Sequence, residues 1–241
     1  MDKSKPQVSI VIAAYNEEKY LPSTLESIAK LKTDQGFEVI VVDNNSTDKT
    51  ARVAEDYKTR LNLRVVSEKK EGRGAARFRG FEVALGKIII STDADAMVYP
   101  DWLKTMTKDI SGEVVATTSS CRIEDGSFLT KTLFNFIQPQ AMILYRLVFG
   151  HFWFCGFSFA ILKSVYQKAG RFNPGLQAQE DLDLSFRVAK LGKIKFINKP
   201  VTVSARRFKQ EGLLLGLYDY IRSFSQAFVF KKKSVYLDNP R

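Results

Sequence analysis

The amino-acid sequence predicts an α/β fold with a mainly parallel central sheet. Two observations support this prediction: β-branched runs alternate with helical patterns, and each run stops at polar residues. The first run is residues 8–14 (VSIVIAA), and residues 17–31 then place apolar side chains at helical spacing. Strands that alternate with helices form right-handed βαβ units, whose parallel strands are buried on both faces.

The strand signal recurs three more times in the first half of the chain. Residues 43–48 (DNNSTD) supply turn and N-cap residues before a helix that is expected to end near Tyr57. Gly72 and Gly74 lead into another helix, which is expected to end near Gly86. The three further strands are residues 37–42, 63–67 and 87–92.

Polar residues follow three of these strands, at 15–17, 43–45 and 93–95. Ligands of parallel α/β sheets bind beyond the carboxyl ends of the strands. We therefore expect the three clusters to converge on one crevice.

The second half of the chain departs from this alternation. A long helix is predicted over residues 129–149, and Pro139 is expected to kink or split it. We expect one domain over residues 1–208 and a C-terminal amphipathic helical extension over residues 209–241. The other predicted elements are strands at 114–120, 154–162, 194–197 and 201–204, and helices at 180–191 and 213–230.

Composition limits the classes of partner. The formal net charge is +11, which favours an anionic partner: nucleic acid, an acidic lipid surface or a phosphorylated substrate. No helix-turn-helix, aromatic RNA-binding strand or zinc-finger spacing is present, so nucleic acid is the weakest of the three.

Cysteine usage and the N-terminus indicate the compartment. Cys121 and Cys155 form no motif and lie in apolar context, which predicts buried reduced thiols. Residues 1–6 are short and polar, unlike a secretory signal. We expect a cytoplasmic protein, with peripheral association at the inner face of the cell membrane as a further expectation.

Asp93, Ala94 and Asp95 place two carboxylates around one small residue at the end of an apolar strand. Two unpaired carboxylates repel each other, and a divalent cation relieves the repulsion. Oxygen ligands suit Mg²⁺ or Mn²⁺, which keep open positions for substrate phosphates. The alternative is that Asp93 only caps the following loop.

Two segments of the first half are candidates for nucleotide contacts. Asp43 ends its strand, where a carboxylate can accept hydrogen bonds from a base or a ribose; an ordinary turn is the alternative. Residues 72–77 (GRGAAR) contain small residues that allow close approach to a ligand, and their amides open a helix toward a phosphate. The alternative there is a surface loop with solvated Arg73 and Arg77.

The second half adds an acidic and a basic pair. Glu180 and Asp181 begin a helix, either as stabilisers of its N-terminus or as a general base for a hydroxyl acceptor. Arg206 and Arg207 end the last strand and suit bidentate contacts to a diphosphate, with solvated surface arginines as the alternative. His151 is interpreted as a packed or interfacial histidine rather than a metal ligand.

Five motifs occur in an order that resembles family 2 of the glycosyltransferases. They are SIVIAAYNEE, VVDNNSTDKT, GRGAARFRG, STDADAMVYPDWL and QEDLDLSFR, and the resemblance covers about residues 7 to 208. It implies the GT-A fold of the nucleotide-diphospho-sugar transferase superfamily, a Rossmann-like three-layer α/β/α arrangement, and an inverting, metal-dependent transfer from a UDP- or GDP-sugar.

The resemblance also implies roles for individual residues. Ala14, Tyr15, Glu17 and Asp43 are expected at the nucleoside. Asp93 and Asp95 are expected to hold the metal and the diphosphate, and Asp181 matches the catalytic base.

The chain departs from its relatives at two places. Some members have a late histidine as a further metal ligand, and nothing matches it. Polyprenyl-phosphate mannose synthases carry a glutamine shortly after the second aspartate, where this chain has residues 96–98 (AMV).

Two other functions compete. A nucleotidyltransferase normally shows a Gly-rich basic loop after the first strand, whereas residues 13–18 (AAYNEE) are acidic and lack glycine. A catalytically silent sugar- or membrane-binding module is disfavoured by the intact carboxylates.

A membrane contact is the last expectation. The aromatic-rich residues 144–159 and the apolar positions of residues 213–230, which precede three lysines, suit an interfacial location. The acceptor would then be a polyprenyl-phosphate or a lipid-linked sugar. The alternative is that these segments pack on the domain.

Overall fold

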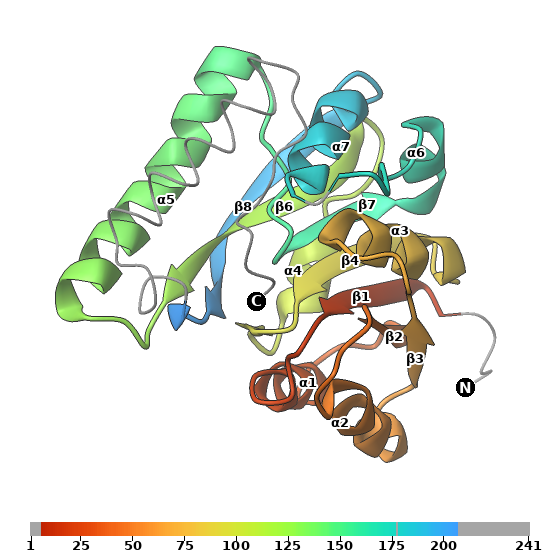
Figure 1. Ribbon diagram of the computed structural model, residues 1–241. Coiled ribbons are helices and arrows are strands. Elements are labelled where there is room, and N and C mark those ends of the chain that lie inside the picture. The colour runs from red at the N-terminus through yellow and green to blue at the C-terminus, as the bar shows by residue number, and fades with distance from the viewer. Residues whose placement is uncertain (1–5, 177, 207–241) are drawn as a thin grey trace.

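The computed structural model describes residues 6–176 and 178–206. One sheet runs through the molecule in the order β3-β2-β1-β4-β7-β6-β8-β5 (Figure 1). Its strands are β1 (Val8–Ala14), β2 (Phe37–Asp43), β3 (Leu63–Ser67), β4 (Ile88–Asp93), β5 (Ala96–Met97), β6 (Val114–Ile123), β7 (Phe159–Leu162) and β8 (Lys193–Val203). The helices are α1 (Leu21–Ala29), α2 (Thr50–Asp56), α3 (Arg73–Val83), α4 (Trp102–Thr107), α5 (Phe128–Phe149), α6 (Lys163–Lys168) and α7 (Glu180–Val188), with a short 3₁₀ turn at Tyr57–Thr59.

The first four strands are parallel and contain the reversal of strand order. The chain moves outward from β1 to β2 and β3, then returns to place β4 on the other side of β1. Strand β7 then pairs antiparallel with β4 and β6, while β6 and β8 pair in parallel. The predicted α/β fold with a mainly parallel sheet is confirmed. The reversal lies between β1 and β4, and such a point opens a crevice at the carboxyl ends of the strands.

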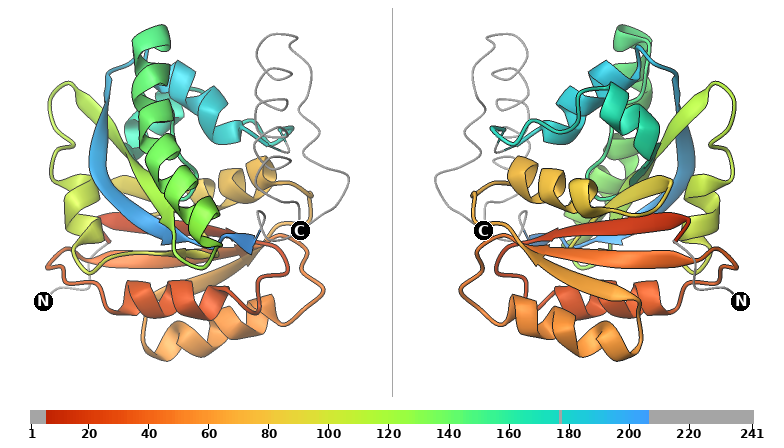
Figure 2. Two further views of the ribbon diagram at one scale, coloured as in Figure 1. Left: turned by 90° about the vertical axis from the view of Figure 1, so that its left-hand side faces the viewer. Right: turned by 90° about the vertical axis from the view of Figure 1, so that its right-hand side faces the viewer.

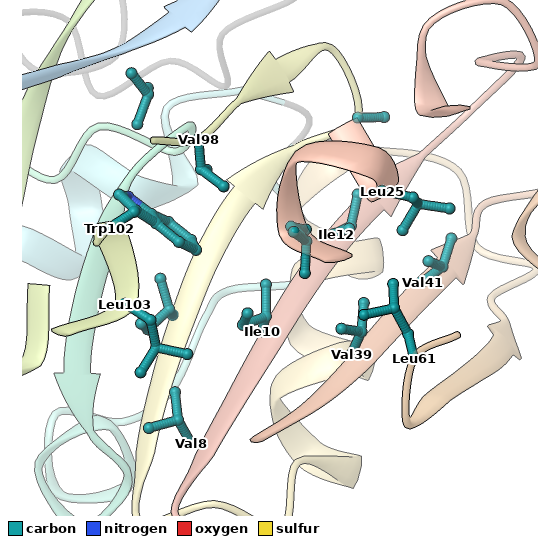
Figure 3. Packing of buried hydrophobic residues seen from close by; sticks show 14 of the residues in the cluster. Val8, Ile10, Ile12, Leu25, Val39, Val41, Leu61, Val98, Trp102 and Leu103 are labelled. Carbon is teal, nitrogen blue, oxygen red and sulfur yellow. The ribbon is translucent and has the colours of Figure 1, made fainter. Parts of the chain in front are cut away.

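Side chains of the central strands alternate between two apolar layers. Ile10 and Ile12 of β1 face α1 and α4, and pack near Leu25 and Trp102 (Figure 3). Val11, between them, faces the opposite side, toward α3. These side chains are fully buried, and each stabilises the fold by about 1.5–3 kcal/mol relative to an exposed position. Helices α1 and α2 lie on one side of the sheet, and α3, α6 and α7 on the other (Figures 1 and 2).

Helix α1 begins at Leu21, four residues after the predicted start at Glu17. Side chains at the start of α2 bond to the segment before α1: the N–H of Glu17 donates to Oγ1 of Thr50 at 2.7 Å, and that of Glu18 to Oδ2 of Asp48 at 3.1 Å. These contacts hold residues 15–20 as a loop beside the carboxyl end of β1.

The region from residue 128 to residue 162 keeps the predicted helix but shortens the predicted strand. Helix α5 runs as one element from Phe128 to Phe149, one residue longer than predicted, with Pro139 inside it rather than at a break. The strand predicted over 154–162 shortens to β7, because the amide of Cys155 bonds to Oγ1 of Thr118 and the chain loops before it pairs. Residues 152 and 154–161 lie largely in the core, whereas the outward side of α5 does not.

Other elements were merged or missed. The strands predicted at 194–197 and 201–204 are one strand, β8, whose pairing with β6 shifts between Ser119 and Cys121. The short elements α4, α6 and β5 were not predicted. Cys121 and Cys155 are buried free thiols, as expected. The extension predicted at 209–241 lies outside the described residues.

Candidate functional site

Three polar loops meet at the carboxyl ends of neighbouring parallel strands. Ala14 at the end of β1 is in register with Asp43 of β2, and Ala13 is in register with Asp93 of β4. The predicted convergence of the clusters at 15–17, 43–45 and 93–95 is therefore confirmed as a feature of the fold.

The loop after β1 is bonded to the loop after β2. The N–H of Asn16 donates to Oγ of Ser46 at 3.0 Å, and the N–H of Thr47 donates to Oδ1 of Asn16 at 2.8 Å. Asn16 has a φ of 53°, a left-handed conformation that asparagine tolerates better than most residues. The two loops therefore form one polar surface at the carboxyl edge of the sheet, with Tyr15 and Asp43 partly exposed on it; we call this edge the crevice and this surface its wall.

Asn44 connects this wall to the start of α3. Its Nδ2 donates to the carbonyls of Glu68 and Lys70 at 2.9 and 2.8 Å, and its Oδ1 accepts from the N–H of Gly72 at 3.0 Å. The side chain is buried, so these bonds satisfy a group that is costly to leave unpaired. The sequence indicated a turn at Asn44 but not this role, since its partners lie 24 to 28 residues away.

Arg206 pairs with two carboxylates of the crevice. Its Nη1 and Nη2 each lie 2.6 Å from an oxygen of Glu17, and its Nε lies 3.1 Å from Oδ2 of Asp95. The guanidinium carbon also lies 4.6 Å from the ring centre of Tyr20. Arg206 was predicted to bind a diphosphate; the structure shows it as the counter-ion of Glu17 and Asp95.

Burial and neighbouring charge alter the carboxyl groups at this point. Desolvation, opposed by Arg206 and reinforced by Asp93 and Glu17, raises the pKa of Asp95 to about 7. Desolvation also raises the pKa of Glu17, despite the contact with Arg206. Burial is the largest cause for both groups, and Arg206 offsets it only in part.

Arg77 forms a second pairing beneath the crevice. Its side chain is 2% exposed; Nη2 lies 2.6 Å from Oδ1 of Asp93, and Nη1 bonds to Oε1 of Glu180. The sequence predicted Arg77 at the donor, and Glu180 as a catalytic neighbour of Asp181. The structure instead buries both side chains, so that they join the strand that carries Asp93 to the helix that carries Asp181.

Asp181 lies beside this pair, at the start of α7. Its Oδ2 accepts a hydrogen bond from the N–H of Gly156 at 2.7 Å, and its Oδ1 accepts one from the N–H of Leu182 at 2.8 Å. Desolvation raises its pKa, while Arg77, these two amides and Arg73 act in the opposite direction. A carboxylate with a raised pKa is a stronger base, which suits proton abstraction.

Two glycines are required by packing around these groups. A Cβ on Gly156 would lie 2.1 Å from Nη2 of Arg77, so only glycine fits against the guanidinium. A Cβ on Gly74 would lie 2.3 Å from the carbonyl oxygen of Leu176. From the sequence, the small residues at 72–77 were predicted to leave space for a ligand. In the structure, Gly74 instead leaves space for the loop that leads to Glu180.

The remaining predicted site residues differ in burial and in location. Ala14 and Ala94 are each 2% exposed, and the carbonyl of Ala94 accepts a hydrogen bond from Oγ1 of Thr24 at 2.8 Å, which fixes the loop of Asp93 and Asp95 to α1. Arg73 lies at the N-terminus of α3. Arg207 lies outside the described residues.

The donor set fits a divalent cation. Carboxylate oxygens are the ligands that Mg²⁺ and Mn²⁺ prefer, and Asp93 and Asp95 stand together in an acidic crevice. Within residues 6–176 and 178–206, no three acidic, histidine or cysteine side chains are grouped as a complete metal site. The protein would supply part of the coordination shell, and substrate phosphate and water would supply the rest.

Comparison with known proteins assigns the family. Residues 9–169 match the model of glycosyl transferase family 2, and the chain belongs to this family. It is 28% identical to chondroitin synthase of Escherichia coli over 202 residues, which cover 82% of this chain and 28% of that protein. It is 34% identical to the putative glycosyltransferase EpsH of Bacillus subtilis (strain 168) over 109 residues, 45% of this chain and 31% of the relative. The chain thus spans about a third of the length of these relatives.

Solved structures share the fold. TarS residues 1–349 of S. aureus, in complex with UDP, superpose with a TM-score of 0.67 at 22% identity, covering 83% of this chain and 60% of that 1–349 chain. The mannosyltransferase PcManGT from Pyrobaculum calidifontis, in complex with GDP-Man and Mn²⁺, gives 0.61 at 23% identity, covering 91% and 65%. The expected GT-A architecture is therefore confirmed.

Proposed function

We propose that this chain is an inverting, metal-dependent glycosyltransferase that moves a sugar from a nucleotide-diphosphate sugar to an acceptor. The observation that carries the proposal is the shared placement of Asp93, Asp95 and Asp181. The first two end β4, the third begins α7, and buried Arg77 connects the two elements through Asp93 and Glu180. Family membership and the complexes of TarS with UDP and of PcManGT with GDP-Man and Mn²⁺ support the choice of donor class.

The crevice divides into regions with different tasks. The wall formed by Tyr15 and Asp43 is the proposed nucleoside region, where the carboxylate accepts hydrogen bonds from the base or ribose. Arg73, at the N-terminus of α3, is proposed to face the diphosphate, since helix N-termini and arginines both favour phosphate. Both uridine and guanosine are compatible with Asp43.

Asp93 and Asp95 would hold Mn²⁺ or Mg²⁺ in this proposal. A bound divalent cation neutralises the negative charge that develops on the departing nucleotide diphosphate. Arg206 already contacts Asp95 and Glu17, so we propose that it retains the counter-ion role at the edge of the metal site rather than binding diphosphate directly.

Asp181 is proposed as the general base. The amides of Gly156 and Leu182 fix its carboxylate, and burial raises its pKa, so it can take the proton of an acceptor hydroxyl as that oxygen attacks the anomeric carbon. A single displacement inverts the configuration of that carbon. Glu180 is proposed to position Asp181 through Arg77 rather than to react itself.

The acceptor is proposed to be a lipid-linked sugar or a polyprenyl-phosphate at the inner face of a membrane, which the protein approaches as a peripheral component. In the described part of the chain, no helix is both long and apolar enough to cross a membrane. A phosphate acceptor is already anionic at neutral pH and needs no base, so the size of the Asp181 effect distinguishes the two acceptor types.

Donor binding tests the proposal directly. We expect UDP or GDP to raise the melting temperature of the full chain in the presence of Mn²⁺, because a ligand that binds only the folded state stabilises it in proportion to its affinity. The effect should disappear with chelator, and Asp95→Asn should weaken it. Stabilisation by neither diphosphate, with or without metal, would support a catalytically silent module of the same fold.

A further inference from the structure

Helix α5 exposes an apolar face of unusual extent. Ten of the thirteen exposed large hydrophobic residues in the described part of the chain belong to this one helix. We define its outer face by the six most exposed of them, which are 63–82% exposed and lie on roughly half of the helix circumference. They are Phe128, Leu129, Phe136, Leu144, Leu147 and Val148.

We propose that the outer face of α5 docks the protein onto an anionic lipid surface, with the helix lying in the plane of the interface. This inference rests on the proposed function, because it identifies the surface that brings a lipid-borne acceptor to the crevice. Soluble proteins rarely expose contiguous apolar patches beyond a few hundred Å², and larger ones mark interaction sites.

The pattern of charge favours lipid. The only charged side chains of α5 are Lys131 and Arg146, both cationic. The guanidinium of Arg146 lies 5.1 Å from the ring centre of Phe152, which holds that charge beside the apolar face. The two acidic residues just before the helix are engaged: Glu124 pairs with Arg122 at 2.8 Å, and Asp125 accepts from the N–H of Ala205 at 2.7 Å. An uncharged apolar strip flanked by cations complements anionic headgroups above acyl chains.

The scarcity of polar groups disfavours a protein partner. Protein interfaces carry about one hydrogen bond per 100–200 Å². The outer side of α5 offers only Thr132 and Gln140 as further exposed polar side chains, and Oγ1 of Thr132 already donates to the carbonyl of Phe128 at 2.9 Å. The helix is also too polar overall to span a bilayer. A helix of 22 residues is about 33 Å long, and an orientation in the plane of the interface agrees with its exposed apolar face and with its inability to span a bilayer.

The ends of α5 connect this face to the crevice. A small cavity beside Asp95 is lined by Glu124 and Asp125, which directly precede the helix. At the other end, the ring of Phe149 lies 5.6 Å from that of Phe186 on α7, the helix that begins with Glu180 and Asp181. A surface that binds α5 therefore lies next to elements that carry both halves of the proposed chemistry.

Flotation with the full chain is the first test. Vesicles of phosphatidylcholine with phosphatidylglycerol should carry the protein at low salt, and pure phosphatidylcholine vesicles should carry less. Replacing Phe136, Leu144 and Leu147 together by Gln should weaken partitioning by about 10²-fold, because three large apolar side chains lose their burial. The matched control, Leu85→Gln with Leu191→Gln, removes exposed apolar residues outside α5 and should bind as the wild type does.

A site-specific label gives the second test. Cys121 and Cys155 are buried, so a cysteine introduced at Leu147 can be labelled selectively with an environment-sensitive fluorophore. Its emission should shift to shorter wavelength with anionic vesicles, whereas the same label at Leu191 should not respond.

Other results would overturn the proposal. If the triple variant floats as well as the wild type, lipid contact lies elsewhere, for example in residues 213–230. If the full chain does not float, the membrane role of α5 fails. If light scattering then shows that the wild type is a dimer and the triple variant a monomer, the outer face of α5 binds a second copy of the chain instead. Metal-dependent hydrolysis of a soluble donor should be unchanged in the triple variant, so loss of docking and failure of the glycosyltransferase proposal are separate outcomes.

Discussion

The crevice and the outer face of α5 depart in opposite directions from the usual distribution of side chains. At the crevice, charged groups go inside: Arg77 is 2% exposed and Glu180 is 1% exposed. On α5, large apolar groups go outside, and Phe128 is 82% exposed. Charged residues are rarely buried unless paired, and large apolar patches are rarely left exposed. Each departure lowers stability unless a partner compensates it.

The loss of stability is compensated in a different way in each region. The buried arginine is compensated within the chain, by Asp93 and Glu180, so its role is to organise the site. The apolar face has no comparable cover among the described residues, and the lipid surface proposed above would be its partner. The crevice should therefore be sensitive to small changes, and the outer face of α5 should tolerate them.

The largest effect is expected at Asp95. Asp95→Asn should reduce metal-dependent donor turnover by about 10³-fold or more, because the cation loses a charged ligand. Binding of Mn²⁺, followed by electron paramagnetic resonance, should weaken in parallel while the circular dichroism spectrum is retained. Asp101→Asn is the matched control, since Asp101 is exposed and pairs with Lys199. Unchanged turnover in Asp95→Asn would refute its role as a ligand.

Asp181→Asn should have the next largest effect. For a hydroxyl acceptor, turnover should fall by about 10² to 10⁴-fold with donor affinity little changed. Because burial raises the pKa of Asp181, wild-type kcat should increase with pH on the acidic side, and the variant should lose this dependence. Asp183→Asn, in the same helix and paired with Arg187, serves as the control.

Two outcomes at Asp181 have different meanings. A loss of donor binding would indicate a structural role instead of base catalysis. An effect much smaller than that of Asp95→Asn would indicate a phosphate acceptor, which needs no deprotonation.

Gly156→Ala should reveal how tightly the buried arginine is packed. The new methyl group would lie 2.1 Å from Nη2 of Arg77, so either Arg77 or the loop must move, at a cost of about 1–3 kcal/mol in unfolding free energy. Gly36→Ala meets nothing within 4 Å and should change stability little. Urea denaturation of both variants measures the difference, and equal stabilities would mean that the guanidinium is not held at this position.

The metal-free protein should become more stable as pH falls. The pKa of Asp95 is raised to about 7 in the folded state from 3.8, so the folded state binds a proton more strongly, and this stabilisation is lost as pH rises through about 7. Lowering the pH from about 8 to about 6 should add about 1 kcal/mol from this group. Thermal melts with chelator should show the trend, and Asp95→Asn should flatten it. A wild-type stability that falls over the same range would contradict the assignment.

The smallest effect is expected on the outer face of α5. Leu147→Gln should change the unfolding free energy by less than about 0.5 kcal/mol, because the side chain is 77% exposed. Phe159→Ala, at a fully buried position, should cost about 3–5 kcal/mol. A cost above 1 kcal/mol for Leu147→Gln would mean that another part of the chain covers this face.

Local sequence patterns were enough to predict the βαβ order and the polar strand ends. Both follow from local patterns: β-branched runs fix the strands, and parallel strands bring their carboxyl ends to one edge of the sheet. This is why Asp43, Asp93 and Asp95 could be assigned to one crevice before the structure was known. Element ends were predicted less well: α1 begins at Leu21, four residues after the predicted start, and the segment before it is bonded to residues 48 and 50.

The pairing of charges and the exposure of one apolar segment, in contrast, depend on the folded arrangement of the whole chain. Arg77 meets Glu180 across 103 residues, and Arg206 meets Glu17 across 189, so no local pattern distinguishes these arginines from solvated ones. The aromatic-rich segment 144–159 looked uniform in sequence, yet its first part is exposed on α5 while Phe154 and Phe159 are fully buried. The hydrophobicity of a side chain predicts only that its transfer out of water is favourable. Which surface receives it depends on how the whole sheet and its helices pack.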